Sequence, residues 1–119
     1  TSPQEIITAR DLVDQVYVAE KIENYIVDLV MATRNPEAYG LKLKDLIQFG
    51  GSPRATINLT LAAKANAFLA GRGYVVPQDV KDLALDILRH RVVITYEAEA
   101  EDRTSESIVT EILNHIPVP

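Results

Sequence analysis

The sequence predicts an all-α domain, a five-helix bundle with room for one pair of very short strands. Three observations support this fold class. Apolar residues recur at helical spacing in five segments, residues that cap or start helices precede these segments, and the glycines and prolines stand mostly at their ends. The 119 residues, of which 47 % are hydrophobic and 24 % charged, suit a single folded domain over residues 1–119.

The first helix is predicted over residues 3–16. Ser2 and Glu5 form a capping box, and Pro3 suits the first helical position. The apolar residues that follow at helical spacing are Ile6, Ala9, Val13 and Val16. A second helix is predicted over residues 20–34, where one buried face is formed by Ile22, Tyr25, Ile26, Leu29 and Val30.

Residues 35–51 form the longest irregular stretch of the sequence. Pro36 stops the preceding helix, because the residue before a proline disfavours helical backbone. The polar and helix-breaking residues of this stretch predict an exposed loop, although three apolar side chains near its end are expected to turn back onto the core. Those three are Leu46, Ile47 and Phe49.

The third helix is predicted to begin with Ser52 as its cap and Pro53 in its first turn. It runs to about Ala70, and Gly71 ends it. Apolar residues occupy most of its sides, which predicts a central helix that its neighbours bury. Only a narrow stripe is expected to be free, and it consists of Thr56, Thr60, Lys64 and Ala67.

The fourth and fifth helices are predicted to open at Pro77 and Thr104. Two short apolar segments, residues 74–76 and 92–95, are candidate strands that could pair with each other. Residues 97–103 are acidic and are interpreted as a solvated loop, because they lack the glycine and the terminal glutamate of an EF-hand calcium site.

The composition excludes several classes of site. Without cysteine there are no disulfides, thiolate metal sites or cysteine nucleophiles, and His90 and His115 stand too far apart for a compact metal motif. No metal site is therefore expected. Both histidines are interpreted as residues near helix C-termini that interact with the last carbonyls. Asp82 and Asp86 have no nucleophile or base beside them, so we do not expect this acidic pair to be catalytic.

The net charge and the hydropathy of the sequence indicate which classes of partner and which cellular location to expect. The net charge of −5 disfavours a nucleic-acid-binding surface, since phosphate-binding proteins usually carry the opposite balance. No apolar run approaches the roughly 18 residues of a membrane span and no signal peptide opens the chain, so a cytoplasmic location is expected. No P-loop or G-x-G-x-x-G pattern is present, so the phosphate loop of a complete nucleotide-binding domain is missing.

The segment G-G-S-P-R-A-T over residues 50–56 carries the strongest functional signal. Its two glycines allow a tight turn, and Ser52 and Pro53 set the start of the third helix. Arg54 then projects from the first turn, where the positive end of the helix dipole disfavours a cation. An arginine held there suggests an anion supplied from outside. The alternative is a salt bridge to a local carboxylate.

This segment, with the following L-x-x-A-A-K-A-x-A, resembles the sensor 2 segment of MoxR-type AAA+ ATPases, which usually reads G-A-S-P-R-A. The likeness continues in order along nearly the whole chain, in Y-I-V-x-L-V-x-A-T-R at residues 25–34, G-R-x-Y-V-x-P-x-D-V at residues 71–80, H-R at residues 90–91 and I-P-V-P at residues 116–119. It covers only the C-terminal helical lid of that family. Gly51 replaces the usual alanine, which is expected to loosen the turn slightly without removing Arg54.

The resemblance implies a role for this turn in ATP binding and hydrolysis. In such ATPases the sensor 2 arginine, here Arg54, reaches from the lid to the β- and γ-phosphates of ATP, which is bound with Mg²⁺ on the core domain. The nucleotide-binding positions that the resemblance carries over are Gly51, Ser52, Pro53 and Arg54, joined by Tyr25 and Ile26 at the adenine pocket. For the last two, an ordinary place in the core is the alternative.

The same resemblance implies a larger machine around this domain. The complete protein would hydrolyse ATP, assemble as a ring, expected to be hexameric, and remodel other proteins as a chaperone, often with von Willebrand factor A-domain partners. Its other partners would be the core domain of the same chain and the neighbouring subunits of the ring. The chain alone lacks the Walker motifs and sensor 1, so it is expected neither to hold a cofactor nor to hydrolyse ATP.

Two other functions stay open from the residues alone. The third and fourth helices, with the short strands, could form a helix-turn-helix or winged-helix nucleic-acid module, but the net charge and the acidic fourth helix disfavour it. A protein-interaction bundle is the other alternative, with residues 35–51 as its contact.

Overall fold

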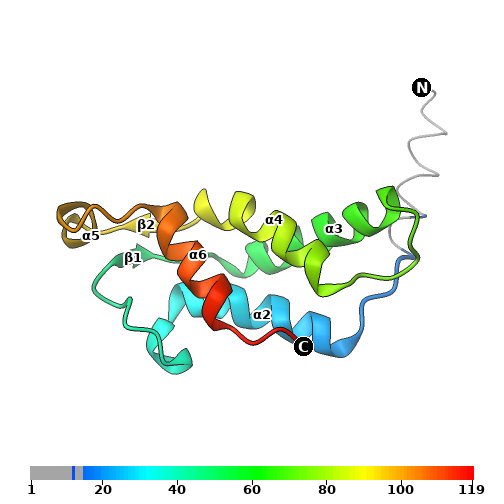
Figure 1. The fold of residues 1–119 in the computed structure, drawn as a ribbon, viewed down its shortest axis with the longest axis horizontal. Coiled ribbons are helices and arrows are strands. Elements are labelled where there is room, and N and C mark those ends of the chain that lie inside the picture. The colour runs from blue at the N-terminus through cyan, green and yellow to red at the C-terminus, as the bar shows by residue number, and fades with distance from the viewer. Residues whose placement is uncertain (1–11, 13–14) are drawn as a thin grey trace, which may run out of the picture.

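The computed structural model describes residue 12 and residues 15–119, so the helix predicted over residues 3–16 lies largely outside the described residues. Three helices, α2 (Glu20–Arg34), α3 (Pro53–Leu69) and α4 (Pro77–Arg89), pack against one another, and α6 (Ser105–His115) crosses α2 and α4 (Figure 1). These four helices confirm those predicted for the same segments. The fold is a helical bundle with one short pair of strands, as the sequence predicts.

Residues 35–51, predicted to be an exposed loop, form ordered structure that packs on the bundle. They contain the short 3₁₀ helix η1 (Pro36–Tyr39) and the strand β1 (Ile47–Phe49). The loop prediction is wrong here because four apolar side chains of this stretch are buried, namely Leu41, Leu43, Leu46 and Ile47. The inward turn expected for Leu46 and Ile47 is thereby confirmed, while the side chain of Phe49 lies outside the described part of the chain.

Two side-chain contacts hold η1 against the helices. The hydroxyl of Tyr39 donates to a carboxylate oxygen of Asp28 on α2 at 3.0 Å. Nε2 of His115, at the end of α6, bonds to the carbonyl oxygen of Tyr39 at 2.6 Å. The predicted place of His115 near a helix C-terminus is confirmed, but its ring contacts the backbone of another segment rather than the last carbonyls of its own helix.

The strand pair joins different segments from those predicted. β1 is antiparallel to β2 (Val93–Ile94), with Ile47 opposite Ile94. The predicted pairing of residues 74–76 with residues 92–95 is wrong, because α4 stands between these two segments. Its 13 residues span about 20 Å, so the two segments lie at opposite ends of the helix.

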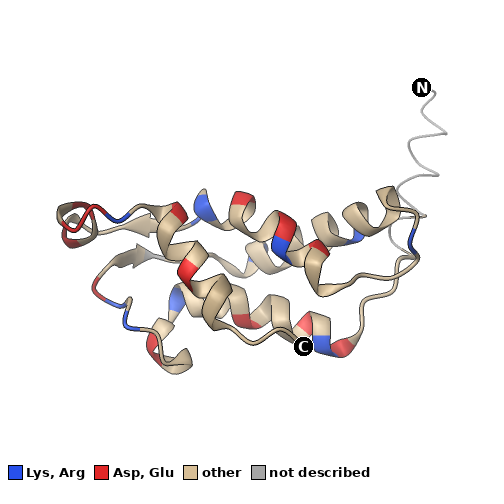
Figure 2. Cartoon of the chain, in the orientation of Figure 1, with Lys and Arg blue, Asp and Glu red and all other residues tan. Residues whose placement is uncertain are grey.

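The acidic segment contains a short helix, α5 (Tyr96–Ala100), so the loop predicted over residues 97–103 is wrong for this part. Thr95 caps the helix, because its hydroxyl accepts a hydrogen bond from the amide of Ala98 at 3.2 Å and donates one to the carbonyl oxygen of Asp45 at 2.7 Å. Ala98 is fully buried and anchors the helix to the core. The acidic side chains stay in solvent at one end of the molecule, as predicted (Figure 2).

Helix α3 is buried along one face only. Its buried residues are Ala55, Leu59, Ala63 and Ala67, and the small size of the three alanines lets α2 and α4 pack closely. On the opposite face Ile57 is 60 % exposed and Leu61 is 47 % exposed. The prediction of a helix buried on most sides is therefore wrong for this chain, since its neighbours cover a single face. Ala67, predicted to be free, is buried.

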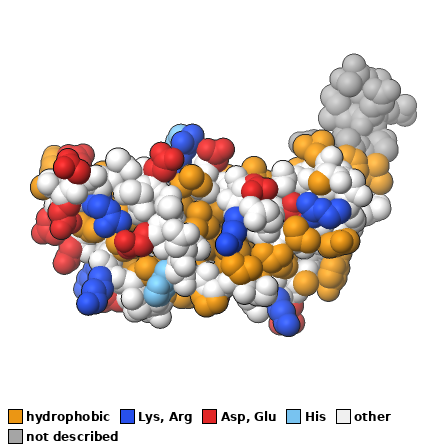
Figure 3. All heavy atoms as spheres, viewed as in Figure 1, with side chains coloured by type: hydrophobic (Ala, Val, Ile, Leu, Met, Phe, Trp, Pro, Cys, Tyr) orange, Lys and Arg blue, Asp and Glu red, His pale blue; other side chains and the backbone are white. Residues whose placement is uncertain are grey.

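Hydrophobic and acidic side chains occupy different parts of the molecular surface. On the face shown in Figure 3, hydrophobic side chains gather away from the acidic end that carries α5. Within the described part of the chain, no helix combines the length and the apolar character that crossing a bilayer requires.

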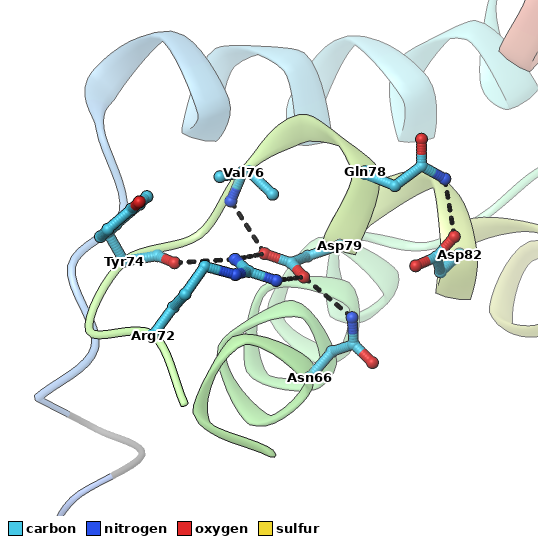
Figure 4. Close-up of polar contacts among 7 residues, drawn as sticks. All are labelled: Asn66, Arg72, Tyr74, Val76, Gln78, Asp79 and Asp82. Atoms are coloured by element: carbon cyan, nitrogen blue, oxygen red, sulfur yellow. Dashed lines mark hydrogen bonds and ion pairs between the residues drawn. The ribbon is translucent and has the colours of Figure 1, made fainter. Parts of the chain in front are cut away.

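A buried carboxylate joins the end of α3 to the start of α4 (Figure 4). Asp79 is 1 % exposed and accepts hydrogen bonds from the side-chain amide of Asn66 and the backbone amide of Val76, both at 2.8 Å. Arg72, in the loop that connects the two helices, forms an ion pair with Asp79 at 2.7 Å. Gly71 has a φ of +79° just after α3, which confirms its predicted place at the C-terminal end of that helix.

Candidate functional site

The candidate site is the start of α3, where the sequence has its strongest functional signal. Ser52 occupies the N-cap position in extended backbone, Pro53 opens the helix, and the amide of Ala55 bonds to the carbonyl oxygen of Ser52 at 2.8 Å. The helix therefore begins where the sequence predicts. The hydroxyl of Ser52 makes no capping hydrogen bond, so the predicted cap is correct in position only.

Arg54 follows in the first turn of α3, with its side chain exposed. Among the residues that the structure describes, it has neither a hydrogen bond nor an ion pair. The local carboxylate partner that the sequence left open as an alternative is thus not found there. Ile57 and Leu61 stand three and seven positions further along the helix, so they share the exposed face with Arg54.

The turn before α3 lies directly against the last turn of α2. A Cβ atom at Gly50 would collide with the carbonyl oxygen of Thr33 and lie 2.7 Å from the amide nitrogen of Arg34, so only glycine fits there. At Gly51 a Cβ atom would lie 3.3 Å from the hydroxyl of Thr33 and 3.4 Å from Cβ of Ala55, which is tight but adjustable. The turn therefore requires its first glycine, whereas alanine can also stand at the second.

Thr33 is a residue of this site that the sequence analysis missed. Its side chain is fully buried, and its hydroxyl donates to the carbonyl oxygen of Val30 at 2.6 Å and accepts from the amide of Gly51 at 2.8 Å. Nothing in the local pattern marks a threonine at the end of an amphipathic helix as the contact of a turn 18 residues later. Its place in the A-T-R motif is the one sequence signal that could have found it.

Tyr25 and Ile26 lie in the core and away from this turn. They are 2 % and 0 % exposed, and Tyr25 stands eight positions before Thr33 along α2, a distance of about 12 Å. The hydroxyl of Tyr25 has no hydrogen-bond partner within the described part of the chain, and burial raises the pKa of that hydroxyl. The structure therefore does not bring these two residues together with Arg54, and their adenine contact stays a prediction.

The remaining candidate residues have structural positions. His90 is the exposed C-cap residue of α4, so its predicted place at a helix C-terminus is confirmed, whereas its predicted interaction with the last carbonyls stays a prediction. Asp82 accepts a hydrogen bond from Gln78 at 2.7 Å, and Asp86 forms an ion pair with Arg89 at 3.1 Å, so each carboxylate interacts with its own helix. Over the described ranges, no group of three or more histidine, cysteine, aspartate or glutamate side chains could hold a metal ion.

Comparison with known proteins gives a consistent result. Residues 43–112 match the AAA lid domain family. The chain is 35 % identical over 119 residues to the chaperone MoxR1 of Mycobacterium tuberculosis, covering 99 % of this chain and 32 % of that protein. It is 34 % identical over 110 residues to the protein MoxR of Paracoccus denitrificans, covering 87 % of this chain and 32 % of that protein.

A solved structure has the same fold. The crystal structure of a putative ATPase from Cytophaga hutchinsonii superimposes with a TM-score of 0.93 at 42 % sequence identity. The match covers 98 % of this chain and 36 % of the other. This chain thus spans about a third of the length of the proteins that it matches.

Proposed function

Because this chain belongs to the AAA lid domain family of MoxR-type AAA+ ATPases, we propose that it is the lid that carries Arg54 to the phosphates of ATP on the core domain of the same ATPase. One observation carries the proposal: the charge of Arg54 stands at the surface of the first turn of α3 with no partner among the described residues. A cation there opposes the helix dipole, and a phosphate arriving from outside would relieve this repulsion.

A guanidinium group suits this task. Its planar donors can bond two phosphate oxygens at once, and it stays charged at any working pH. During phosphoryl transfer, negative charge spreads over the γ-phosphate oxygens, and positive groups held in place stabilise it. Mg²⁺ and the phosphate loop of the core domain would supply the rest of this stabilisation. The contribution of this chain is one arginine held in a defined place.

The residues around Arg54 support an anion at the same place. The hydroxyl of Ser52 does not cap α3, so the positive end of the helix dipole remains available to a phosphate. Pro53 fixes the backbone at the helix start, since its ring restricts φ. The amide of Gly51, a position that the resemblance also assigns to nucleotide binding, is bonded to Thr33 of α2, so in this proposal Gly51 acts by holding the turn in place.

The exposed apolar face of α3 supports a contact with the core domain. Ile57 and Leu61 lie on the face that carries Arg54, so the surface that would approach the nucleotide is partly apolar. When this face leaves the core domain, Arg54 leaves the phosphates as well. Opening and closing of the lid would thereby depend on the nucleotide state.

The complete protein would use this coupling to do mechanical work on other proteins. The name of the Mycobacterium tuberculosis relative, chaperone MoxR1, supports a chaperone function. We extend the proposal to ATP hydrolysis with Mg²⁺, to assembly as a hexameric ring in the cytoplasm, and to von Willebrand factor A-domain partners. The family assignment favours this function over a nucleic-acid module and over a simple interaction bundle.

The proposal is tested by ATP turnover of the complete ATPase with Arg54→Ala. Loss of one charge-stabilising donor costs about 2.7–4 kcal/mol in the transition state, so turnover should fall by about 10²-fold or more. Arg91→Ala is the matched control, since the side chain of Arg91 is also exposed and also has no hydrogen bond or ion pair among the described residues. Equal turnover of the two variants would contradict the proposal.

A further inference from the structure

A single hydroxyl connects the last turn of α2 to the turn that precedes Arg54. The oxygen of Thr33 accepts the hydrogen bond of the Gly51 amide at 2.8 Å, three residues before the arginine. The same hydroxyl donates its proton to the carbonyl oxygen of Val30 at 2.6 Å. This second bond fixes the direction of the hydroxyl, so its lone pairs face the Gly51 amide.

The surroundings of this bond leave the turn little freedom. Thr33 is fully buried, so water does not compete for its hydroxyl. The backbone of Gly50 lies so close to the carbonyl of Thr33 that no Cβ atom fits between them. The close contact of Gly50 with the Thr33 carbonyl and the hydrogen bond of Gly51 to the Thr33 hydroxyl therefore set the position of the turn on α2.

We infer that Thr33 is a positioning residue for Arg54, an inference that rests on the proposed function. Arg54 sits on the first turn of α3, and the place of that turn is set by the hydrogen bond between Thr33 and Gly51. A displacement of about 1 Å at a group that acts on the transition state can cost as much as 10²-fold in rate. The hydroxyl of Thr33 would thus act on turnover through Arg54, although Thr33 itself is buried.

The functional part of Thr33 is its hydroxyl rather than its volume. Thr33→Val keeps the branched shape but leaves the Gly51 amide without its acceptor. Thr33→Ser keeps the acceptor and loses one methyl group. A role in packing alone predicts that serine is the more harmful replacement, because it removes buried volume. A positioning role predicts that valine is the more harmful one.

The experiment is a double-mutant cycle on ATP turnover in the complete ATPase, with Thr33→Val, Arg54→Ala and the double variant. We expect Thr33→Val to lower kcat about tenfold and Thr33→Ser to recover most of that loss. In the Arg54→Ala background, Thr33→Val should change kcat by less than about twofold, because the group it positions is already gone. Thr110→Val is the matched control, since the Thr110 hydroxyl also bonds to a carbonyl of its own helix but to no turn.

The outcomes separate this inference from the proposed function. If Arg54→Ala lowers kcat and Thr33→Val does not, or if Thr33→Val lowers kcat equally in both backgrounds, the positioning role is wrong and the proposed function stands. If Arg54→Ala leaves kcat unchanged, the proposed function fails and this inference fails with it. The Gly51 amide resonance of the 119-residue chain shows independently of activity whether Thr33→Val has broken the hydrogen bond.

Discussion

Arg72 donates two hydrogen bonds of 2.7 Å to Asp79, one to each carboxylate oxygen. This bidentate ion pair connects the loop after α3 to the first turn of α4 (Figure 4). Arg72 is the main cause that lowers the pKa of Asp79 to about 2, against the opposing effect of burial. The charged carboxylate is therefore the form that the folded protein prefers.

The stability of the chain should fall in acid because of this pair. The pKa of Asp79 is lower in the folded state than in the unfolded state, so its stabilisation is present above about pH 4. It is lost as the pH falls through about 2. Asp79→Asn should lower the free energy of unfolding at pH 7 by about 2 kcal/mol and flatten its decline between pH 4 and pH 2. Urea unfolding followed by circular dichroism measures both effects.

Asp82→Asn is the control for this prediction. Asp82 is exposed and bonds only to Gln78 within the described part of the chain, so its replacement should change the free energy of unfolding by less than about 0.5 kcal/mol. A similar loss in both variants would mean that the Arg72 pair does not stabilise the fold in the way described.

The two glycines of the turn should respond differently to alanine. Gly50→Ala forces a Cβ atom into the carbonyl of Thr33, so the free energy of unfolding should fall by about 3 kcal/mol or more. Gly51→Ala meets only tight contacts and restricts the unfolded chain, so it should stay within about 1 kcal/mol of the parent. The denaturant midpoints of the two variants measure this difference. Equal losses of stability in both variants would contradict the described packing of Gly50 against Thr33.

Tyr25→Phe should not weaken the fold. The buried hydroxyl of Tyr25 has no partner among the described residues, so its removal should leave the free energy of unfolding unchanged or raise it by about 1 kcal/mol. A loss of more than about 1 kcal/mol would reveal a hydrogen bond that the described structure does not contain. The KM for ATP of the same variant in the complete ATPase tests the adenine contact, since only that contact predicts a higher KM.

The chain by itself should neither hydrolyse ATP nor bind it tightly. One arginine cannot replace a loop of backbone donors together with Mg²⁺, so we expect a Kd no tighter than about 1 mM. Isothermal titration calorimetry with the 119-residue chain measures this directly. Micromolar binding would mean that the chain holds a nucleotide site of its own.

Local signals in the sequence were enough to predict the four helices α2, α3, α4 and α6. Apolar periodicity, proline at the helix start and glycine at the helix end act within a few residues, so they can be interpreted without knowing the fold. Gly71 is an example, since its positive φ ends α3 where the pattern predicts. The start of α3, and with it the place of Arg54, was predictable for the same reason.

The features that the sequence did not predict depend on contacts between distant segments. Ile47 pairs with Ile94, and the Thr95 hydroxyl bonds to Asp45, which is 50 residues away. No local pattern specifies such partners. The exposed face of α3 is a related case, because its apolar residues look buried until the positions of the neighbouring helices are known. Thr33 was missed because the turn that it holds comes 18 residues later.

The contact between Arg54 and the nucleotide can be measured directly in a structure of the complete ATPase with Mg²⁺ and a non-hydrolysable ATP analogue. With the lid closed, a guanidinium nitrogen of Arg54 should lie about 2.7–2.9 Å from an oxygen of the β- or γ-phosphate. Thr33 should keep its hydrogen bond to Gly51 in that state. An Arg54 side chain that points into solvent or pairs with a carboxylate, with every guanidinium nitrogen more than about 3.5 Å from the phosphate oxygens, would contradict the account.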